Sequence, residues 1–372
     1  MDRRKFVTQS TLAVTAAAFC VSLPSFGNFL NTTVMKESDI KNKRYRPLSV
    51  SGLGGVAAGN GFHENPDNSV TAALEAAWDS SVRYFDTSPW YGLGLSERRF
   101  GHFLRNKKRE EYTLSTKVGR LLTPDKDFKL EKGLWKGKLN FSYRYDYSAA
   151  GTRRSIEDSL QRLGVPYLDI VYIHDLSPDN QDMKENWLKY FDEAMKGAIP
   201  ELTKMREEGI IKAWGFGVNT LEPALKAIEQ ADPDIFLSAT QYSLIKHEEA
   251  LNKLFPVCEK RDISIVVGAP LNAGFLAGVE RYDYSGTFPD GVIEKRNKLI
   301  TVSKKHGVDL RTAALQFCAA PKVVSGVIPG AWNPEQVNAN AASFKASIPK
   351  AFWDELKSEK LIAENAPIPS DK

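Results

Sequence analysis

Asp86, Lys117 and His174 end three successive apolar, β-like runs, and Tyr91 follows Asp86 by five residues in a turn. Polar side chains at the carboxyl ends of parallel strands meet at one end of a barrel, where barrel enzymes build their sites. A nearby ammonium favours the phenolate of a tyrosine and so lowers its pKa. We therefore expect Lys117, held by Asp86, to lower the pKa of Tyr91, which would exchange a proton with a substrate oxygen that His174 orients. The alternatives are an ordinary buried ion pair and a structural tyrosine in a surface turn.

Apolar runs alternate with amphipathic, helix-like segments along almost the whole chain, and these elements must position the polar residues. The predicted strands are 48–55, 84–86, 113–117, 168–174, 211–218, 235–241, 263–268 and 323–329. The predicted helices are 71–80, a helix with Ser96 as its N-cap, 155–163, 187–208, 221–230, 248–260, 292–306, 310–319 and one from Pro334. Eight alternations with near-continuous apolar strands predict an α/β fold, a single-domain (β/α)8 TIM barrel. A doubly wound open sheet is the alternative, but no G-x-G-x-x-G follows the first strand.

The connections after the third and seventh strands are longer than a barrel needs. They span 121–150 and 268–290 and are rich in aromatic residues. Long loops at the catalytic end of a barrel commonly form pocket walls or lids. We therefore expect Trp135 and Tyr145, from the first of these connections, to contact the substrate together with Trp90, which adjoins Tyr91. The alternative is that these aromatic residues pack on one another and only cover the barrel.

The composition argues against a nucleic-acid partner and against a metal site. The chain has 372 residues, 42% hydrophobic and 26% charged, with a formal net charge of only +4 and no basic stripe interleaved with aromatic residues. Cys258 and Cys318 lie in apolar helical patterns without C-x-x-C spacing, which predicts buried thiols. The five histidines are scattered and none belongs to an H-E-x-x-H motif, so we expect no metal.

The N-terminal segment has the pattern of an export signal. Basic residues at 3–5 precede an apolar run at 11–21, which is too short to span a bilayer. The double arginine resembles a twin-arginine signal, which predicts a twin-arginine export machinery as a partner and a periplasmic or secreted location. The expected division is a signal at 1–27, a linker at 28–46 and the barrel at 47–372, without stable membrane insertion. A lipoprotein anchored at Cys20 and an uncleaved N-terminus in a cytoplasmic protein are the alternatives.

The stretch that begins at Asp86 contains the pattern D-T-x-x-x-Y-G-x-x-x-S-E-x-x-x-G. Its defined positions are Asp86, Thr87, Tyr91, Gly92, Ser96, Glu97 and Gly101. This pattern, with strands that end in Lys117 and His174, resembles the signature of the aldo-keto reductases. The resemblance implies hydride transfer with a nicotinamide dinucleotide, NAD or NADP, and a catalytic set of Asp86, Tyr91, Lys117 and His174.

The same resemblance implies a set of cofactor-binding residues on the later strands. They are Asn219 and Gln241 at the nicotinamide carboxamide, Gly268, Ala269, Leu271 and Asn272 at the pyrophosphate, and Gly330, Trp332, Asn333, Gln336 and Asn340 at the adenosine end. Members of the family that prefer NADP tend to place a basic residue just after the Gly-Ala pair at 330–331. Trp332 and Asn333 stand there, and neither can pair with a 2′-phosphate as arginine would, which favours NAD.

Narrower motifs, YGLGLSERR, LSTKVGRLL and DIVYIHDL, are similar to the branch that contains L-fucose dehydrogenase, D-threo-aldose 1-dehydrogenase and pyridoxal 4-dehydrogenase. This resemblance implies oxidation of a sugar such as L-fucose or D-arabinose at the anomeric hydroxyl to a lactone. Reduction of small aldehydes or ketones, or non-catalytic nicotinamide sensing, are the alternatives. Because an exported enzyme meets no free nicotinamide pool, we hypothesise that it leaves the cytoplasm with its cofactor bound and recycles it between two substrates.

Overall fold

The computed structural model describes residues 44–130, 133–284 and 286–369. The predicted signal at 1–27 lies outside the described residues, as does all but the last part of the predicted linker. Eight parallel strands form one sheet in the order β1, β2, β3, β6, β7, β8, β9, β10. Their bounds are β1 Gly52–Gly54, β2 Tyr84–Asp86, β3 Thr113–Val118, β6 Leu168–His174, β7 Ile211–Val218, β8 Ile235–Ala239, β9 Ser264–Gly268 and β10 Val324–Ile328.

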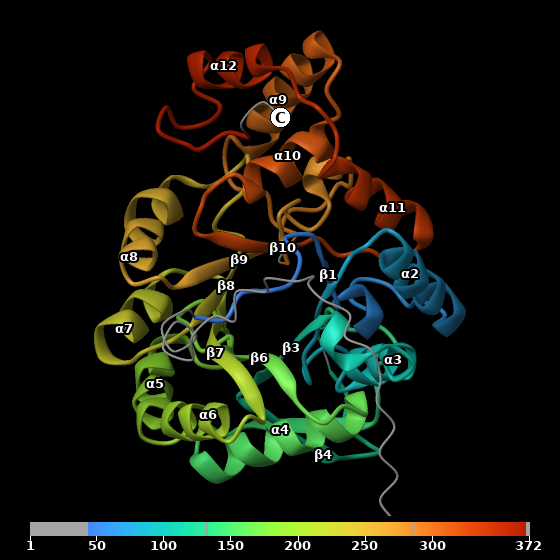
Figure 1. Ribbon diagram of the computed structural model, residues 1–372, viewed down its shortest axis with the longest axis vertical. Coiled ribbons are helices and arrows are strands. Elements are labelled where there is room, and N and C mark those ends of the chain that lie inside the picture. The colour runs from blue at the N-terminus through green and yellow to red at the C-terminus, as the bar shows by residue number, and fades with distance from the viewer. Residues whose placement is uncertain (1–43, 131–132, 285, 370–372) are drawn as a thin grey trace, which may run out of the picture. The chain divides into compact units, whose positions relative to one another are not determined.

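Parallel bridges between Ser51 and Val327 and between Gly54 and Gly330 join the first strand to the last. They close the sheet into a barrel, and helices surround the strands (Figure 1). The helices are α2 Asp67–Asp79, α3 Leu95–Leu104, α4 Ala149–Leu163, α5 Trp187–Lys196, α6 Ala198–Glu207, α7 Glu222–Gln230, α8 Phe255–Lys260, α9 Val292–His306, α10 Leu310–Ala319, α11 Pro334–Ser343 and α12 Lys350–Ser358. The prediction of a (β/α)8 barrel is confirmed.

The strands are apolar along their length because the helices cover their outer sides and other side chains fill the barrel. Every residue of β3 and β6 is buried. Inside the barrel, Tyr84 and Tyr172 share a hydrogen bond of 3.1 Å between their hydroxyl groups, which satisfies two polar atoms that burial would otherwise leave unpaired. Cys258 and Cys318 are buried free thiols, as predicted.

Ser96 does not cap the second predicted helix. α3 begins one residue earlier, at Leu95, after Gly94 with a φ of 95°. The Ser96 hydroxyl instead donates to the Gly55 carbonyl at 2.9 Å and accepts from Thr87 Oγ1 at 2.8 Å. It therefore ties the loops that follow β1 and β2 to one another.

The single helix predicted from 187 to 208 is two helices, α5 and α6, which meet at Gly197. The backbone there has a φ of −121° and a ψ of −74°, outside the helical range. A Cβ at this position would lie 2.5 Å from the carbonyl oxygen of Tyr147, so the chain passes close to that backbone and breaks the helix.

The two long connections differ in structure. After β3 the chain forms an antiparallel hairpin of β4 Arg120–Pro124 and β5 Phe141–Tyr145, and α4 then begins at a Ser148 N-cap, earlier than predicted. After β9 the described residues between 269 and 291 contain one regular element, a 3-10 turn at Phe275–Ala277. Among the described residues, no helix combines the length and the apolar character needed to cross a membrane.

Candidate active site

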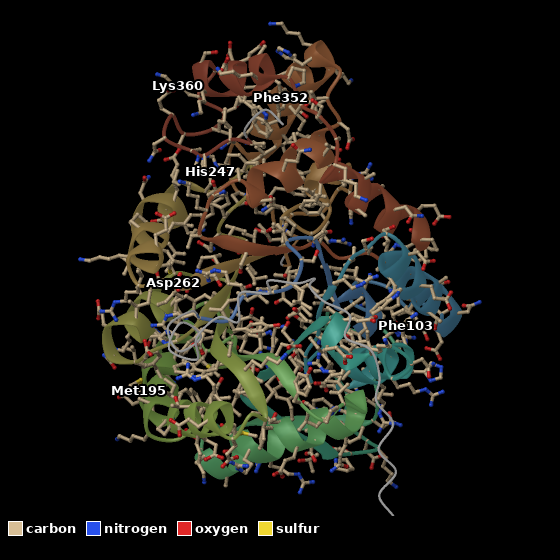
Figure 2. The ribbon with its side chains drawn as sticks, in the orientation of Figure 1. Phe103, Met195, His247, Asp262, Phe352 and Lys360 are labelled. Carbon is tan, nitrogen blue, oxygen red and sulfur yellow. The ribbon has the colours of Figure 1, made fainter. Side chains whose placement is uncertain are left out.

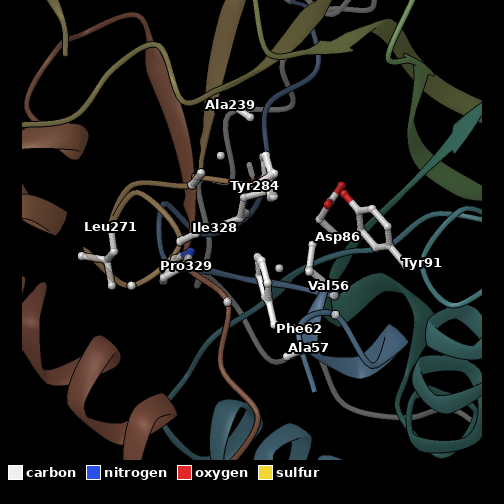
Figure 3. Close-up of a pocket in the computed structure, with 18 of the residues that line it drawn as sticks. Val56, Ala57, Phe62, Asp86, Tyr91, Ala239, Leu271, Tyr284, Ile328 and Pro329 are labelled. Atoms are coloured by element: carbon white, nitrogen blue, oxygen red, sulfur yellow. The ribbon is translucent and has the colours of Figure 1, made fainter. Parts of the chain in front are cut away.

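A cavity of about 590 Å³ opens at the carboxyl ends of the strands, and every strand of the barrel contributes to its wall. Asp86 and Tyr91 lie on one side of it and Leu271 and Pro329 on the other, with Phe62 between them (Figure 3). The cavity therefore lies at the end of the barrel where the sequence predicted the site.

Asp86 and Lys117 form an ion pair at the bottom of the cavity. Lys117 Nζ lies 2.8 Å from Asp86 Oδ2 and donates a second hydrogen bond of 2.8 Å to the Thr87 carbonyl. Ser115 Oγ donates to the other carboxylate oxygen at 2.6 Å. Burial raises the pKa of Asp86 and lowers the pKa of Lys117, and the attraction between the two charges opposes both shifts.

Tyr91 lies beside this pair, but its pKa is shifted in the direction opposite to the prediction. Lys117 Nζ stands over the face of the Tyr91 ring, 4.5 Å from its centroid, and two of its hydrogen bonds go to other groups. Burial, followed by the charge of Asp86, raises the pKa of Tyr91 well above its ordinary value. The phenol is therefore protonated at neutral pH, ready to donate a proton.

His174 faces Tyr91, with 5.8 Å between the ring centroids. Its Nδ1 lies 3.2 Å from Ser88 Oγ, which already accepts a hydrogen bond from the Trp90 amide. We assign the hydrogen of the neutral imidazole to Nε2, so that Nδ1 accepts the Ser88 proton and Nε2 faces the carboxylate oxygen of Asp175 at 3.5 Å. Burial, and then the charges of Lys117 and Arg120, lower the pKa of His174 well below its usual value, so the ring is neutral. His174 can thus donate one hydrogen bond into the cavity.

Aromatic residues build the wall around Tyr91. Trp135 lies 5.4 Å from the Tyr91 ring and 5.8 Å from the Trp90 ring, and both tryptophans line the cavity. Tyr145, the third residue expected to contact the substrate, is not part of the cavity wall. Its hydroxyl bonds instead to Asn180 and Asp182, in the segment that follows β6.

Most of the residues expected to bind the cofactor line the cavity. They are Asn219, Gly268, Ala269, Leu271, Gly330, Trp332, Gln336 and Asn340. Gln241, Asn272 and Asn333 are not part of the wall. Gln241 donates to the Asn219 carbonyl, Asn272 donates to Asp283 at 3.0 Å, and Asn333 caps α11 by accepting from the Gln336 amide at 2.9 Å. These three side chains therefore hold neighbouring segments of the chain in place and do not face the cavity themselves.

Two arginines that the sequence reasoning missed line the part of the cavity that lies against the later strands. The Arg281 guanidinium stacks 3.6 Å over the Phe62 ring, and Arg311 Nε is buried without a hydrogen-bond partner in the structure. Arginine side chains and backbone glycines such as Gly330 in the wall of one cavity suit an elongated anionic dinucleotide. Arg281 could have been found from the sequence, because it is a basic residue in the long loop after the seventh strand. Arg311 lies in helix α10, and no sequence pattern indicated that it would face the cavity.

Asp175 was also missed, although it directly follows His174 at a strand end and its charge was visible in the sequence. It lines the cavity and pairs with Arg120, the first residue of the hairpin, at 2.9 Å. Within the described ranges, no group of three or more histidines, cysteines or carboxylates is placed to hold a metal ion.

Comparison with known proteins places these features in one family. The model of the aldo/keto reductase family matches residues 52–360. The D-threo-aldose 1-dehydrogenase of a Pseudomonas species is 36% identical over 327 residues, which cover 84% of this chain and 94% of that protein. The pyridoxal 4-dehydrogenase of Microbacterium luteolum is 36% identical over 334 residues, 85% and 95% of the two chains. An aldo/keto reductase of Klebsiella pneumoniae, solved with NADP and acetate, superposes with a TM-score of 0.60 at 20% identity, over 87% of this chain and 95% of that one.

Proposed function

The chain belongs to the aldo/keto reductase family and is an NAD(P)-dependent oxidoreductase, and from this premise we propose that it oxidises a cyclic aldose at the anomeric carbon to a lactone. The observation that carries the proposal is the 36% identity, over nearly the whole length, to a D-threo-aldose 1-dehydrogenase. The tryptophan faces around Tyr91 support it, because aromatic rings pack well against the apolar face of a sugar ring.

In the proposed mechanism, a bound nicotinamide supplies the acceptor for the hydride that leaves the anomeric carbon. His174 donates its Nε2 hydrogen to the substrate oxygen and holds it near Tyr91. Tyr91 takes the proton of the anomeric hydroxyl as the C–H bond breaks, and the carbonyl of the lactone forms. Lys117 and Asp86 fix the position of the tyrosine ring. Because oxidation needs the phenolate, the rate of oxidation rises with pH through the neutral and alkaline range.

A second function, reduction of small aldehydes or ketones, is favoured by one observation. The raised pKa of Tyr91 keeps the phenol protonated, and a protonated phenol is the form that donates to a carbonyl oxygen. The same residues would then run the reaction in reverse. Initial rates measured in both directions at one pH, with aldoses and with simple aldehydes, separate the two functions.

The proposed cofactor is NAD rather than NADP. Trp332 and Asn333 occupy the positions after the Gly-Ala pair, and Asn333 is engaged as the cap of α11, so neither offers a positive charge to a 2′-phosphate. Arg311 lies in the same wall, and its ion pair with Asp309 is long, at 3.6 Å, so its guanidinium has donors left for a phosphate of the cofactor. Dissociation constants for NAD and NADP, measured by quenching of tryptophan fluorescence, decide this point.

The central test is Tyr91→Phe, which removes one oxygen from the proposed proton-transferring group. We expect kcat to fall by about 10²- to 10⁴-fold, the usual contribution of general acid–base catalysis. Tyr143→Phe is the matched control, because Tyr143 bonds through its hydroxyl to Asp182 outside the cavity wall. Undiminished turnover of the best aldose by Tyr91→Phe refutes the mechanism. Dinucleotide binding without turnover of any substrate, in either direction, identifies a sensing protein instead.

We also propose that the twin-arginine-like leader exports the folded protein with its dinucleotide bound. Mass spectrometry of protein purified natively from the exported fraction tests both parts of this proposal. A cleaved chain with bound NAD(H) or NADP(H) is the expected result. An empty protein that turns over aldoses with added NAD contradicts the preloaded state, and a full-length chain in the cytoplasm contradicts export.

A further inference from the structure

Asp175 is held in the cavity wall by an unusual backbone conformation. It follows β6 directly and has a φ of 47°, in the left-handed region that residues other than glycine rarely adopt. Its amide donates to the Gly217 carbonyl at 3.0 Å, and its own carbonyl accepts from Asn180 Nδ2 at 2.8 Å. Strained conformations of this kind persist where the surrounding structure fixes them, often at functional sites.

One oxygen of the Asp175 carboxylate is already used. Arg120 Nη1 donates to Oδ2 at 2.9 Å. Arg120 is itself nearly buried and lies over the rings of Trp90 and Tyr145, 4.6 Å and 5.1 Å from their centroids. The arginine is therefore held between the aromatic wall and the carboxylate, and it fixes the direction in which the carboxylate points.

The other oxygen is available. Oδ1 has no hydrogen bond to another side chain in the described part of the molecule, and it lies 3.5 Å from His174 Nε2, the nitrogen that donates into the cavity. The side chain of Asp175 is 20% exposed. A hydrogen-bond donor and a charged acceptor thus stand side by side where the substrate oxygen must lie.

We propose that Asp175 Oδ1 accepts a hydrogen bond from the hydroxyl on the carbon next to the anomeric carbon, and so selects sugars over simple aldehydes. This inference rests on the proposed aldose oxidation. The donor on His174 takes the reacting oxygen, and a carboxylate, which can only accept, requires a group with its own hydrogen. The ring oxygen of the sugar has none, so the adjacent hydroxyl is the group of the right chemistry within reach. Asp175 is a specificity residue in this scheme and takes no part in proton transfer.

The test measures kcat/KM for two pairs of sugars that differ only at this hydroxyl: L-fucose and 2-deoxy-L-fucose, and D-arabinose and its 2-deoxy form. A hydrogen bond to a charged group predicts that the wild type prefers each parent sugar by about 10- to 100-fold. In Asp175→Asn this preference falls to within about threefold, because the loss affects the parent sugar selectively. Asp182→Asn is the matched control and keeps the wild-type preference, since Asp182 accepts from Tyr143 and Tyr145 away from the cavity.

Asp175→Glu guards against a folding defect, because it keeps the charge that faces Arg120 and moves the acceptor by one methylene. It too should lose the preference for the parent sugars. If the wild type oxidises aldoses but either soluble Asp175 variant loses parent and deoxy sugars equally, or loses neither, the inference is overturned and the proposed function stands. If the wild type oxidises none of the four sugars and reduces simple aldehydes instead, the proposed function fails and takes the inference with it.

Discussion

The two sides of the cavity are built in different ways. On the strand-end side, which comprises Asp86, Tyr91, Lys117 and His174, the side chains come from β2, β3, β6 and the turn after β2, and they contact one another directly. The loop side comprises the residues after β9 and β10. Its wall combines backbone glycines with side chains such as Leu271, Trp332 and Arg281.

The difference extends to the backbone and to unpaired atoms. The loop side contains Ala269 and Ala273, both with positive φ, and Arg311 Nε, which has no hydrogen bond within the described residues and lies 3.6 Å from Asp309 Oδ2. On the strand-end side, Asp86 and Lys117 have their hydrogen bonds within the protein. The catalytic geometry is thus fixed by internal contacts, whereas the loop side leaves contacts for a ligand to make.

The largest expected effect is a loss of unfolding free energy when the Asp86–Lys117 ion pair of the strand-end side is broken. Lys117→Met leaves the buried Asp86 carboxylate unpaired, and breaking a buried pair in this way costs about 3–5 kcal/mol of unfolding free energy. Urea denaturation measures the loss, and Asp86→Asn added to Lys117→Met should recover most of it. Lys350→Met removes an exposed partner of Asp354 and should cost less than about 0.5 kcal/mol. Equal losses in the two lysine variants would show that the interior pair is no more important to folding than a surface one.

The next effect is a dependence of the folding stability on pH, and it comes from His247, which lies outside the cavity wall. His247 (Figure 2) is buried, its Nδ1 lies 3.0 Å from the Ser243 carbonyl, and its Nε2 accepts from the Ala363 amide at 3.0 Å. Burial, and then the charge of Lys295, lower the pKa of His247 to about 4. The unfolded chain takes up this proton near pH 6.5, before the folded protein does, so the stabilisation is complete above that pH and is lost as the pH falls toward 4.

The expected loss for His247 is about 3 kcal/mol, from a pKa shift of roughly two and a half units. Denaturation at a series of pH values should show a smaller decline between pH 6.5 and pH 4 in His247→Gln than in the wild type. His174, also with a lowered pKa, accounts for a decline that remains in the variant. Parallel pH profiles for the two proteins would mean that His247 does not couple to folding.

A smaller effect on kcat is expected when His174, on the strand-end side, loses its hydrogen bond to Ser88. Ser88→Ala removes the hydrogen bond to His174 Nδ1, so the imidazole loses the group that keeps its hydrogen on Nε2. We expect kcat to fall by about 3- to 10-fold, the equivalent of one neutral hydrogen bond. The ¹⁵N NMR shifts of His174 should change from a single Nε2–H tautomer to a mixture. Ser88→Thr keeps the hydroxyl and should restore the wild-type spectrum, which a purely structural role for Ser88 would not explain.

The smallest effect concerns the loop side. Arg311→Gln removes a cation whose ion pair with Asp309 is long, at 3.6 Å, and we expect the dissociation constant of the dinucleotide to rise by up to about fivefold, as for a partly exposed ion pair. The value of kcat should not change, because the strand-end side is untouched. Arg154→Gln, which removes an exposed pair with Asp158 on α4, is the control. A fall in kcat with unchanged cofactor affinity would mean that the two sides are not independent.

The same contrast explains what could be predicted from the sequence. Asp86, Lys117 and His174 were visible because each ends an apolar run, and Tyr91 was visible because it follows Asp86 by five residues. The barrel fold fixes where the strand ends lie. The direction of the Tyr91 pKa shift was not visible, because it depends on burial and on whether the Lys117 ammonium faces the ring or the hydroxyl. Asp175 and Arg120 meet only through the hairpin, whose geometry no local pattern encodes. Gly197 breaks a helix because of a contact with Tyr147, which lies far away in the sequence.

The pairing of β1 with β10, which closes the barrel and forms its seam, has a consequence for the order of folding. The Val327 amide donates to the Val50 carbonyl at 2.7 Å and the Gly54 amide to the Pro329 carbonyl at 3.1 Å, so the barrel closes through contacts between its two ends. Contacts of such long sequence separation form late, which means that a nascent chain completes its barrel only after synthesis has passed β10. Gly54 and Pro329 also line the cavity, and a molecule bound there touches both edges of the seam. A bound ligand would therefore stabilise the pairing of β1 with β10, the last pairing to form, and without the ligand we expect this pairing to open first.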